Sequence, residues 1–167
     1  MCQQNCAIVA LMAGARWLDE REARLWQAYR DLTRDLQRAF DRQLERDAGV
    51  SGADYALLVP LSEAPDGVVR MRELGKAVGW DRSRLSHQVR RMENRGLVTR
   101  EECADDARGL MVRLTPSGRA AIEAAAPEHV ATVRRYFFDQ LSEPEQKTLA
   151  RLFERMAGKL AADADET

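Results

Sequence analysis

The stretch SRLSHQVRRMENRGLVTR, at residues 83–100, carries hydroxyl, imidazole and guanidinium side chains that can bind a polyanion. Arginine and serine donate hydrogen bonds to phosphates, and arginine also pairs with the major-groove edge of guanine. Residues 70–100 contain nine basic and three acidic residues, a net charge of +6, whereas the whole chain carries −1. The remainder therefore carries −7, and this contrast predicts a localised nucleic-acid surface. The alternative at this point is a helix whose charges only solvate it.

Apolar residues at helical spacing indicate which side of this stretch faces a core. Leu85, Val89 and Met92 recur at intervals of four and three, which predicts a helix over residues 82–95 with these side chains turned inward. The polar donors then lie on the opposite face and its flanks: Ser83, His87, Arg90 and Asn94, flanked by Arg84, Ser86 and Arg91.

The residue types on this face suggest two kinds of contact with DNA. We expect Arg84, His87 and Arg90 to contact bases, because guanidinium and imidazole groups match the acceptors of the major groove. The hydroxyls of Ser83 and Ser86 are expected to bind phosphate or to have mixed roles.

A shorter helix is predicted just before this one, over residues 71–79, with Met71, Leu74 and Val78 on one face. Gly79 ends it, and only the residues GWD separate the two helices. Asp81 or Ser83 can cap the second helix. Two helices joined by a tight turn that contains glycine form a helix-turn-helix pattern, although many helical hairpins share it.

The elements predicted after the second helix make the pattern more specific. Gly96 ends the helix, and residues 97–103 and 109–114 are predicted to be strands. Between them, residues 104–108 (ADDAR) form a charged hairpin tip that carries Arg108. A helix-turn-helix with a β-hairpin directly after it is the order of a winged helix.

Long amphipathic helices are predicted on both sides of this region. Apolar residues spaced by three and four predict a helix over residues 19–48, ended by Gly49. SGAD at 51–54 is a capping box that begins a helix through about residue 63, and residues 68–70 can form a short strand.

Two more helices are predicted after the hairpin. Thr115 caps the first, with Pro116 at its first position. Pro127 is expected to interrupt or kink this helix, because proline lacks the N–H that the helix needs. SEPE at 142–145 is another capping box, which begins the last helix.

Several classes of protein are excluded by what the sequence lacks. At 167 residues the chain has room for one ordinary domain. Three cysteines without a framework spacing argue for a reducing cytoplasm, and Cys2 and Cys6 have no second pair with which to bind zinc. No apolar run approaches the length of a membrane span. No known catalytic motif is present, so we expect no enzyme, no catalytic residue, no cofactor and no metal site.

The order of elements and three motifs resemble the MarR family of bacterial transcription regulators. The motifs are RSRLSHQVRRMENRGLV, the wing's Asp106-x-Arg108 followed by Gly109, and LTPSGR. The resemblance covers roughly residues 17–160 in order and length. It implies a mainly α fold with a small β-wing, in which a winged helix-turn-helix is flanked by long N- and C-terminal dimerisation helices.

The resemblance also implies a division of the chain. Residues 51–115 would form the DNA-binding lobe, and residues 16–50 and 116–162 the helical dimerisation region. Residues 1–15 are expected to be a disordered extension and residues 163–167 a frayed tail. The implied function is that of a homodimeric, sequence-specific repressor in the cytoplasm that binds a pseudo-palindromic double-stranded operator and releases it on binding a small ligand.

The family pattern assigns roles to particular residues. The predicted DNA-binding set is Arg82, Ser83, Arg84, Ser86, His87, Arg90, Arg91, Asp106 and Arg108. In this set Asp106 would pair with Arg91 and brace the wing, and Arg108 would enter the minor groove. The alternative for Arg91 is an ordinary surface ion pair.

The effector pocket of the family lies between the dimerisation helices and the lobe. Its candidates here are Trp17, Trp26, Tyr29, Tyr55 and His129, which could accept a small aromatic or phenolic compound. The same aromatic residues could instead be dimer core. A redox-responsive regulator and a non-specific architectural DNA-binding protein are the alternative functions, although the acidic neighbours of Cys103 weaken a redox role.

Overall fold

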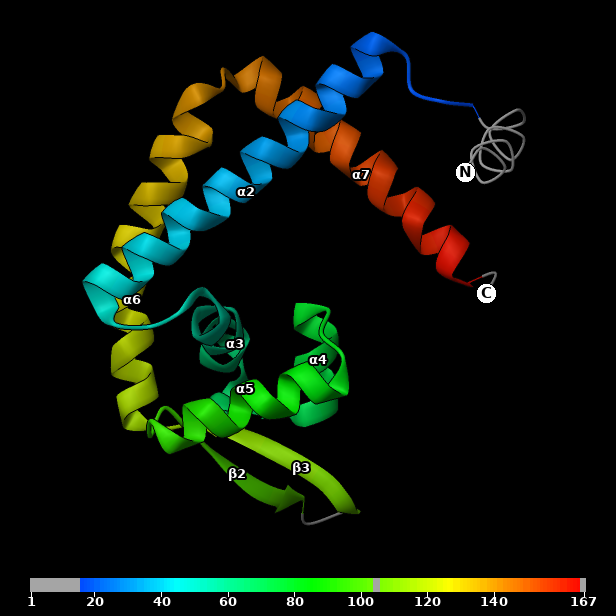
Figure 1. The fold of residues 1–167 in the computed structure, drawn as a ribbon. Helices are drawn as coiled ribbons and strands as arrows, with labels where there is room; N and C mark the ends of the chain where they lie inside the picture. Colours follow the sequence, from blue (N-terminus) through cyan, green and yellow to red (C-terminus); the bar gives the residue numbers. More distant parts are fainter. Residues whose placement is uncertain (1–15, 104–105, 166–167) are drawn as a thin grey trace, which may run out of the picture. The chain divides into compact units, whose positions relative to one another are not determined.

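The computed structural model describes residues 16–103 and 106–165 (Figure 1). The chain divides into two compact units, residues 1–37 and residues 38–167, which are described separately. In the first unit the described residues are 16–37, most of them in helix α2 (Glu20–Ala48), which continues into the second unit. The predicted extension at residues 1–15 lies outside the described residues.

The second unit contains the predicted winged helix and the two C-terminal helices. After α2 the elements are α3 (Gly52–Glu63), η1 (Pro65–Gly67), β1 (Val68–Arg70), α4 (Met71–Val78), α5 (Arg82–Asn94), β2 (Val98–Cys103), β3 (Asp106–Leu114), α6 (Pro116–Tyr136), η2 (Phe138–Gln140) and α7 (Glu143–Asp165). The predicted fold class, mainly helical with a small wing, is confirmed. None of the helices within these described ranges is both long and apolar enough to cross a membrane.

Helix ends follow the local signals in the sequence. Ser51 and Asp54 form both hydrogen bonds of a capping box at the start of α3. At α5 the cap is Asp81, whose carboxylate accepts a hydrogen bond from the backbone N–H of Arg84. Gly79 and Gly96 have positive φ values of 67° and 72°, which only glycine adopts freely, and so they end α4 and α5.

The three strands form one antiparallel sheet in the order β1-β3-β2. Val69 of β1 and Arg100 of β2 both pair with Val112 of the central strand β3. The hairpin was predicted correctly, but its tip is shorter than expected, because β3 begins at Asp106 and includes Arg108. Cys103 pairs with Asp106 beyond an irregularity in the register, so strand pairing extends up to the two residues that lie outside the described ranges.

Helix α6 runs through Pro127 as one continuous helix, so the predicted interruption is wrong. Proline removes one backbone hydrogen bond, which is a local loss. Ile122 and Ala125 before the proline and Thr132 after it are buried. Packing on both sides of the proline therefore keeps the helix in place.

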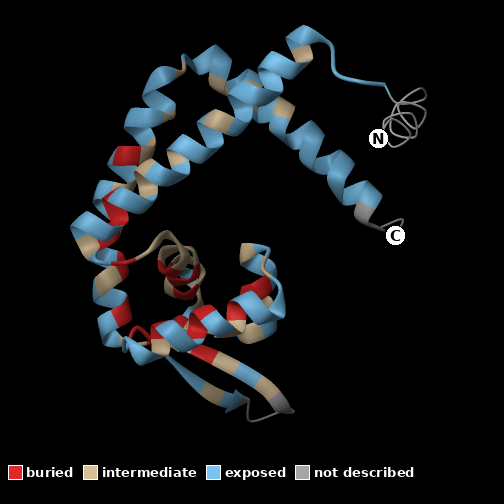
Figure 2. Cartoon of the chain, in the orientation of Figure 1, coloured by how far each residue is buried: buried red, intermediate tan, exposed pale blue. Residues whose placement is uncertain are grey.

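The core of the second unit gathers around α3 (Figure 2). Leu57, Leu58 and Leu61 of α3 are completely buried, and they belong to one cluster with residues of α4, α5 and the sheet: Leu74, Leu85, Val89, Met92, Val98 and Val112. The three apolar residues predicted to anchor the 82–95 helix are thus all in the core. Burial of this face leaves the opposite face of α5 in solvent.

The start of α6 packs directly on the backbone after α5. The hydroxyl of Thr115 donates to the carbonyl oxygens of Gly96 and Leu97 and caps α6. A Cβ atom placed on Gly118 would collide with the carbonyl oxygen of Leu97. Only a glycine allows the two backbones to approach this closely.

Candidate nucleic-acid interface

Helix α5 exposes the side chains that the sequence predicted it would. Its buried residues are Leu85, Gln88, Val89 and Met92. The residues of the predicted site on this helix are exposed, apart from the half-buried Ser86: Arg82, Ser83, Arg84, His87, Arg90 and Arg91. The side chains of the remaining two, Asp106 and Arg108, lie outside the described part of the structure, and the backbone places both residues on β3. The structure therefore brings six exposed residues of the predicted set onto one helix.

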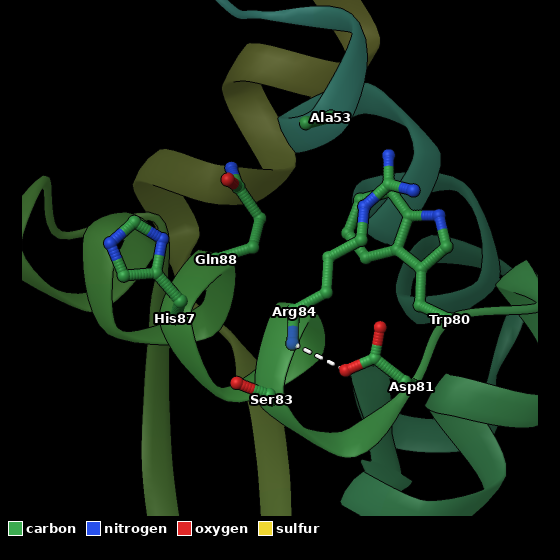
Figure 3. Close-up of a pocket in the computed structure, with 7 residues that line it drawn as sticks. All are labelled: Ala53, Trp80, Asp81, Ser83, Arg84, His87 and Gln88. Atoms are coloured by element: carbon green, nitrogen blue, oxygen red, sulfur yellow. Dashed lines mark hydrogen bonds between the residues drawn. The ribbon is translucent and has the colours of Figure 1, made fainter.

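Arg84 lies over the indole ring of Trp80, with its guanidinium carbon 4.2 Å from the ring centroid. A guanidinium over an indole gains a cation–π attraction and loses side-chain freedom. Both residues line a surface hollow of about 530 Å³ at the start of α5, together with Ala53 and Gln88 (Figure 3). His87 and Ser83 of α5 also line this hollow, and Figure 3 shows the imidazole of His87 apart from the guanidinium of Arg84. Trp80 thus fixes the direction of a guanidinium that was predicted to contact bases.

A second hollow, of about 720 Å³, lies between α4, α5 and the strands. Its basic lining residues are Arg70, Arg72, Lys76 and Arg82, and its apolar ones include Met71, Leu85 and Leu110. Of its lining residues, Arg82 and Ser86 were among the predicted site residues. The other three bases belong to the positively charged segment at residues 70–100, and the structure shows that they extend the basic surface beside α5.

Two arginines of the basic stretch are held by acids of the same unit. Arg100 of β2 binds the carboxylate of Glu93 in α5, with Nη2 2.6 Å from Oε2. The hydrogen bond from Arg100 is the main reason why the pKa of Glu93 is below its usual value. Arg95 donates from Nη1 to Asp54 and from Nη2 to the carbonyl oxygen of Gly49. These two arginines therefore connect elements of the lobe, which the sequence did not indicate.

Asp54 is the one buried carboxylate of this network, with 1% of its surface exposed. Besides its capping bonds with Ser51, it accepts hydrogen bonds from Gln88 and Arg95 of the α5 region. The sequence identified Asp54 only as a capping residue. Its partners are 34 and 41 positions away, and no local pattern reveals a contact across such a distance.

The candidate effector residues divide between the two units. Tyr55 and His129 lie together in the second unit, with ring centroids 4.4 Å apart. Phe40 packs edge-on against His129, whose Nδ1 is 3.3 Å from the side-chain oxygen of Gln43. Burial lowers the pKa of His129 and raises the pKa of Tyr55.

The other three effector candidates belong to the first unit. Trp26 and Tyr29 stack on each other along α2, with ring centroids 5.4 Å apart. Both side chains are about half exposed, and Trp17 is 64% exposed. The structure therefore brings together two pairs of the predicted residues, one in each unit.

Comparison with known proteins supports the same interpretation. Residues 48–109 match the MarR family. The chain is 34% identical over 102 residues to the transcriptional regulator HosA of Escherichia coli O157:H7, which covers 61% of this chain and 73% of HosA. The chain belongs to the MarR family.

Solved structures of MarR-family regulators agree over nearly the whole chain. Sco3205 of Streptomyces coelicolor, crystallised in complex with DNA, is 42% identical, with a TM-score of 0.83 over 87% of this chain and 92% of Sco3205. AbsC of the same organism is 38% identical, with a TM-score of 0.84 over 89% of this chain and 99% of AbsC. The chain is accordingly a MarR-family DNA-binding transcriptional regulator with a winged helix-turn-helix, and this family is not one of enzymes.

Proposed function

We propose that this MarR-family regulator is a homodimeric, sequence-specific repressor that binds a pseudo-palindromic operator and releases it when a small ligand binds. The observation that carries the proposal is helix α5, which buries its apolar anchors and exposes a row of hydrogen-bond donors. Such a helix fits the major groove, where the donors can reach base edges. Because bacterial DNA is cytoplasmic, we place the protein in the cytoplasm.

The proposed contacts follow the direction of each side chain. Arg84, His87 and Arg90 are assigned to bases, because they are exposed on the same helix and two of them carry guanidiniums. Ser83 and Ser86 are assigned to phosphate or mixed roles, and Arg82 joins them beside the basic hollow.

The wing completes the proposed interface. Asp106 is proposed to pair with Arg91 and so to brace the wing against α5. Arg108 is proposed to enter the minor groove, where a narrow A·T-rich segment concentrates negative potential. The position of both residues on β3 supports these roles, because they lie beyond the part of β3 that pairs with β1, toward the turn of the β2–β3 hairpin.

Two long helices support the homodimer. In α2 the side chains of Leu25, Trp26, Tyr29 and Leu32 are 52–70% exposed, and in α7 those of Phe153, Met156 and Leu160 are 48–72% exposed. Apolar rows of this length mark interfaces in soluble proteins. A second copy of the chain is the proposed partner, with residues 16–50 and 116–162 as the dimerisation region and residues 51–115 as the DNA-binding lobe.

The proposed ligand is a small aromatic or phenolic compound. Half-buried aromatic side chains at Tyr55 and His129 can stack against such a ring, and the imidazole can hydrogen bond to a hydroxyl. Trp17, Trp26 and Tyr29 are assigned to the same role or to the dimer core.

Selection of bound duplexes from a random pool tests the proposal. We expect one enriched palindrome-like sequence, bound far more tightly than a random duplex of the same length at the same salt concentration. Arg90→Ala should weaken binding to the enriched duplex by about 1–3 kcal/mol, as expected for one bidentate base contact. Arg155→Ala, an exposed arginine on α7, is the control and should leave affinity unchanged.

Other outcomes would point to the alternatives. Equal affinity for the enriched and random duplexes would indicate an architectural DNA-binding protein. Release of DNA by peroxide, abolished by substitution of the cysteines, would indicate a redox-responsive regulator. Unchanged operator affinity of Arg108→Ala would contradict the minor-groove assignment.

A further inference from the structure

The carboxylate of Asp54 makes more hydrogen bonds than a helix cap requires. Its Oδ2 accepts from the backbone N–H and the hydroxyl of Ser51, at 2.9 and 2.8 Å, which belongs to the capping of α3. The same oxygen accepts from Nη1 of Arg95, and Oδ1 accepts from Nε2 of Gln88 at 2.7 Å. The last two donors come from the α5 region, so one buried carboxylate joins the start of α3 to the recognition helix.

Arg95 adds a second connection at the same place. Its Nη2 donates to the carbonyl oxygen of Gly49 at 2.6 Å. Gly49 immediately follows the last residue of α2 and has a positive φ of 62°. We call the set Gly49, Ser51, Asp54, Gln88 and Arg95 the Asp54 latch. It holds the turn between α2 and α3 against Arg95, the C-cap residue of α5.

Two attachment points along α5 constrain the helix more than one would. Gln88 and Arg95 are seven residues apart, which is about two helical turns, so they lie on the same side of α5. A helix fixed at two such points can neither rotate about its axis nor slide. Rotation matters here because His87 and Arg90 are exposed on α5 within two residues of Gln88 and would move with it.

We propose that the Asp54 latch positions the recognition helix for sequence-specific binding and transmits movement of the end of α2 to it. The inference rests on the proposed function. Arg95 is then a positioning residue and does not bind phosphate. The last turns of α2 also carry Gln43, which contacts His129, so a ligand beside His129 would act on the helix end that the latch holds.

The test separates positioning from two simpler roles. The variants are Asp54→Asn, Arg95→Gln and both together, with Arg155→Gln as the control for loss of one positive charge. The probes are the duplex enriched by the wild-type protein and a random duplex of equal length, titrated over a range of salt concentrations, and urea unfolding is measured in parallel.

Positioning predicts a loss of discrimination. Each single variant should bind the enriched duplex at least about fivefold more weakly, which is equivalent to about 1 kcal/mol. The affinity for the random duplex should change less than twofold, which is about 0.4 kcal/mol. The double variant should bind the enriched duplex with the same affinity as the single variant that loses more affinity, because both substitutions break the same connection.

Two results would overturn the proposal. If Arg95→Gln weakens both duplexes equally and lowers the salt slope by about one, Arg95 is a phosphate contact. If the variants lower the free energy of unfolding and leave both affinities unchanged, the latch only stabilises the fold. Gln88→Leu, which keeps the capping box and the ion pair, provides the same comparison if Asp54→Asn does not fold.

A measurement without DNA keeps this inference distinct from the proposed function. In the free protein, Asp54→Asn and Gln88→Leu should speed amide hydrogen exchange in residues 88–96 and leave residues 118–125 of α6 unchanged. If the wild-type protein enriches no duplex, the proposed function fails, yet faster exchange in α5 would still support the latch. Unchanged exchange in α5 would overturn it.

Discussion

The winged-helix lobe and the first part of α2 differ in how far their apolar side chains are buried. In the lobe, Leu57, Leu58 and Leu61 are fully buried within the same unit. In the described residues 16–37, no residue is buried, and Leu25 is 70% exposed. The lobe therefore has a core of its own, whereas the first part of α2 needs further surface to cover its apolar row.

Charge pairing differs in the same way. In the first part of α2 the ion pairs are local, such as Arg24 with Glu20 and Arg34 with Asp31. In the lobe, Arg95 reaches Asp54 and Arg113 reaches Glu101, across 41 and 12 positions. Ion pairs between residues three or four apart stabilise the helix that contains them. Ion pairs between residues far apart in the sequence fix the relative positions of two elements. The ion pairs of the lobe therefore fix the relative positions of its elements, whereas those in the first part of α2 stabilise the helix alone.

The largest effect is expected from Leu58→Ala, which tests the statement that the lobe has its own core. Leu58 is completely buried, and truncating its side chain should leave a cavity that costs about 2–5 kcal/mol of unfolding free energy. Urea unfolding followed by circular dichroism at a fixed protein concentration measures it. A loss under about 0.5 kcal/mol, typical of surface sites, would show that this core is not what stabilises the lobe.

Leu25→Asp tests the other side of the comparison. A carboxylate in the apolar row of α2 should weaken dimerisation at least tenfold, about 1.4 kcal/mol, because the charge loses water on association. Sedimentation analysis over a range of concentrations measures this. Ala23→Asp, with the same charge on the opposite side of the helix, should leave the dimer unchanged. Equal effects of the two variants would contradict an interface along this row.

The smallest effect is expected at His129, where the later turns of α2 meet α6. Burial favours the neutral imidazole and lowers the pKa of His129, so folding is supported above the unfolded pKa of about 6.5. As the pH falls below about 6.5 toward the folded pKa, that support is lost. The difference in unfolding free energy between the wild type and His129→Gln should therefore shrink on acidification. Parallel pH profiles would show that His129 is not desolvated.

Much of the fold could be predicted because its signals are local. The Ser51–Asp54 capping box, the Gly79 and Gly96 ends and the three apolar anchors of α5 are all evident from spacing within a few residues. Each of these depends on φ, on one hydrogen bond or on helical period. Such features are encoded by neighbours in the sequence.

The features that were missed depend on contacts between residues far apart in the sequence, on competition between opposing effects, or on the direction of a side chain. The contact between Arg95 and Asp54 joins residues 41 positions apart, and no sequence pattern near either residue predicts it. Interruption of the helix, one of the two outcomes expected at Pro127, does not occur, because packing of α6 on both sides outweighs one missing hydrogen bond. The stacking of Arg84 on Trp80 involves residues four apart, and only the structure shows which way the guanidinium turns.

Gly118 bears on how this protein can change over time. Its backbone conformation is ordinary for a helix, so other residues could adopt it, yet the carbonyl oxygen of Leu97 occupies the place of any side chain. At Gly49 the restriction is the reverse: there is space for a side chain, and only the positive φ of the backbone limits which residue can stand there. Residues on the exposed face of α5 can be exchanged without disturbing either site. The exposed face of α5 is thus free to diverge among descendants of this chain, while the glycine at position 118 must be inherited unaltered.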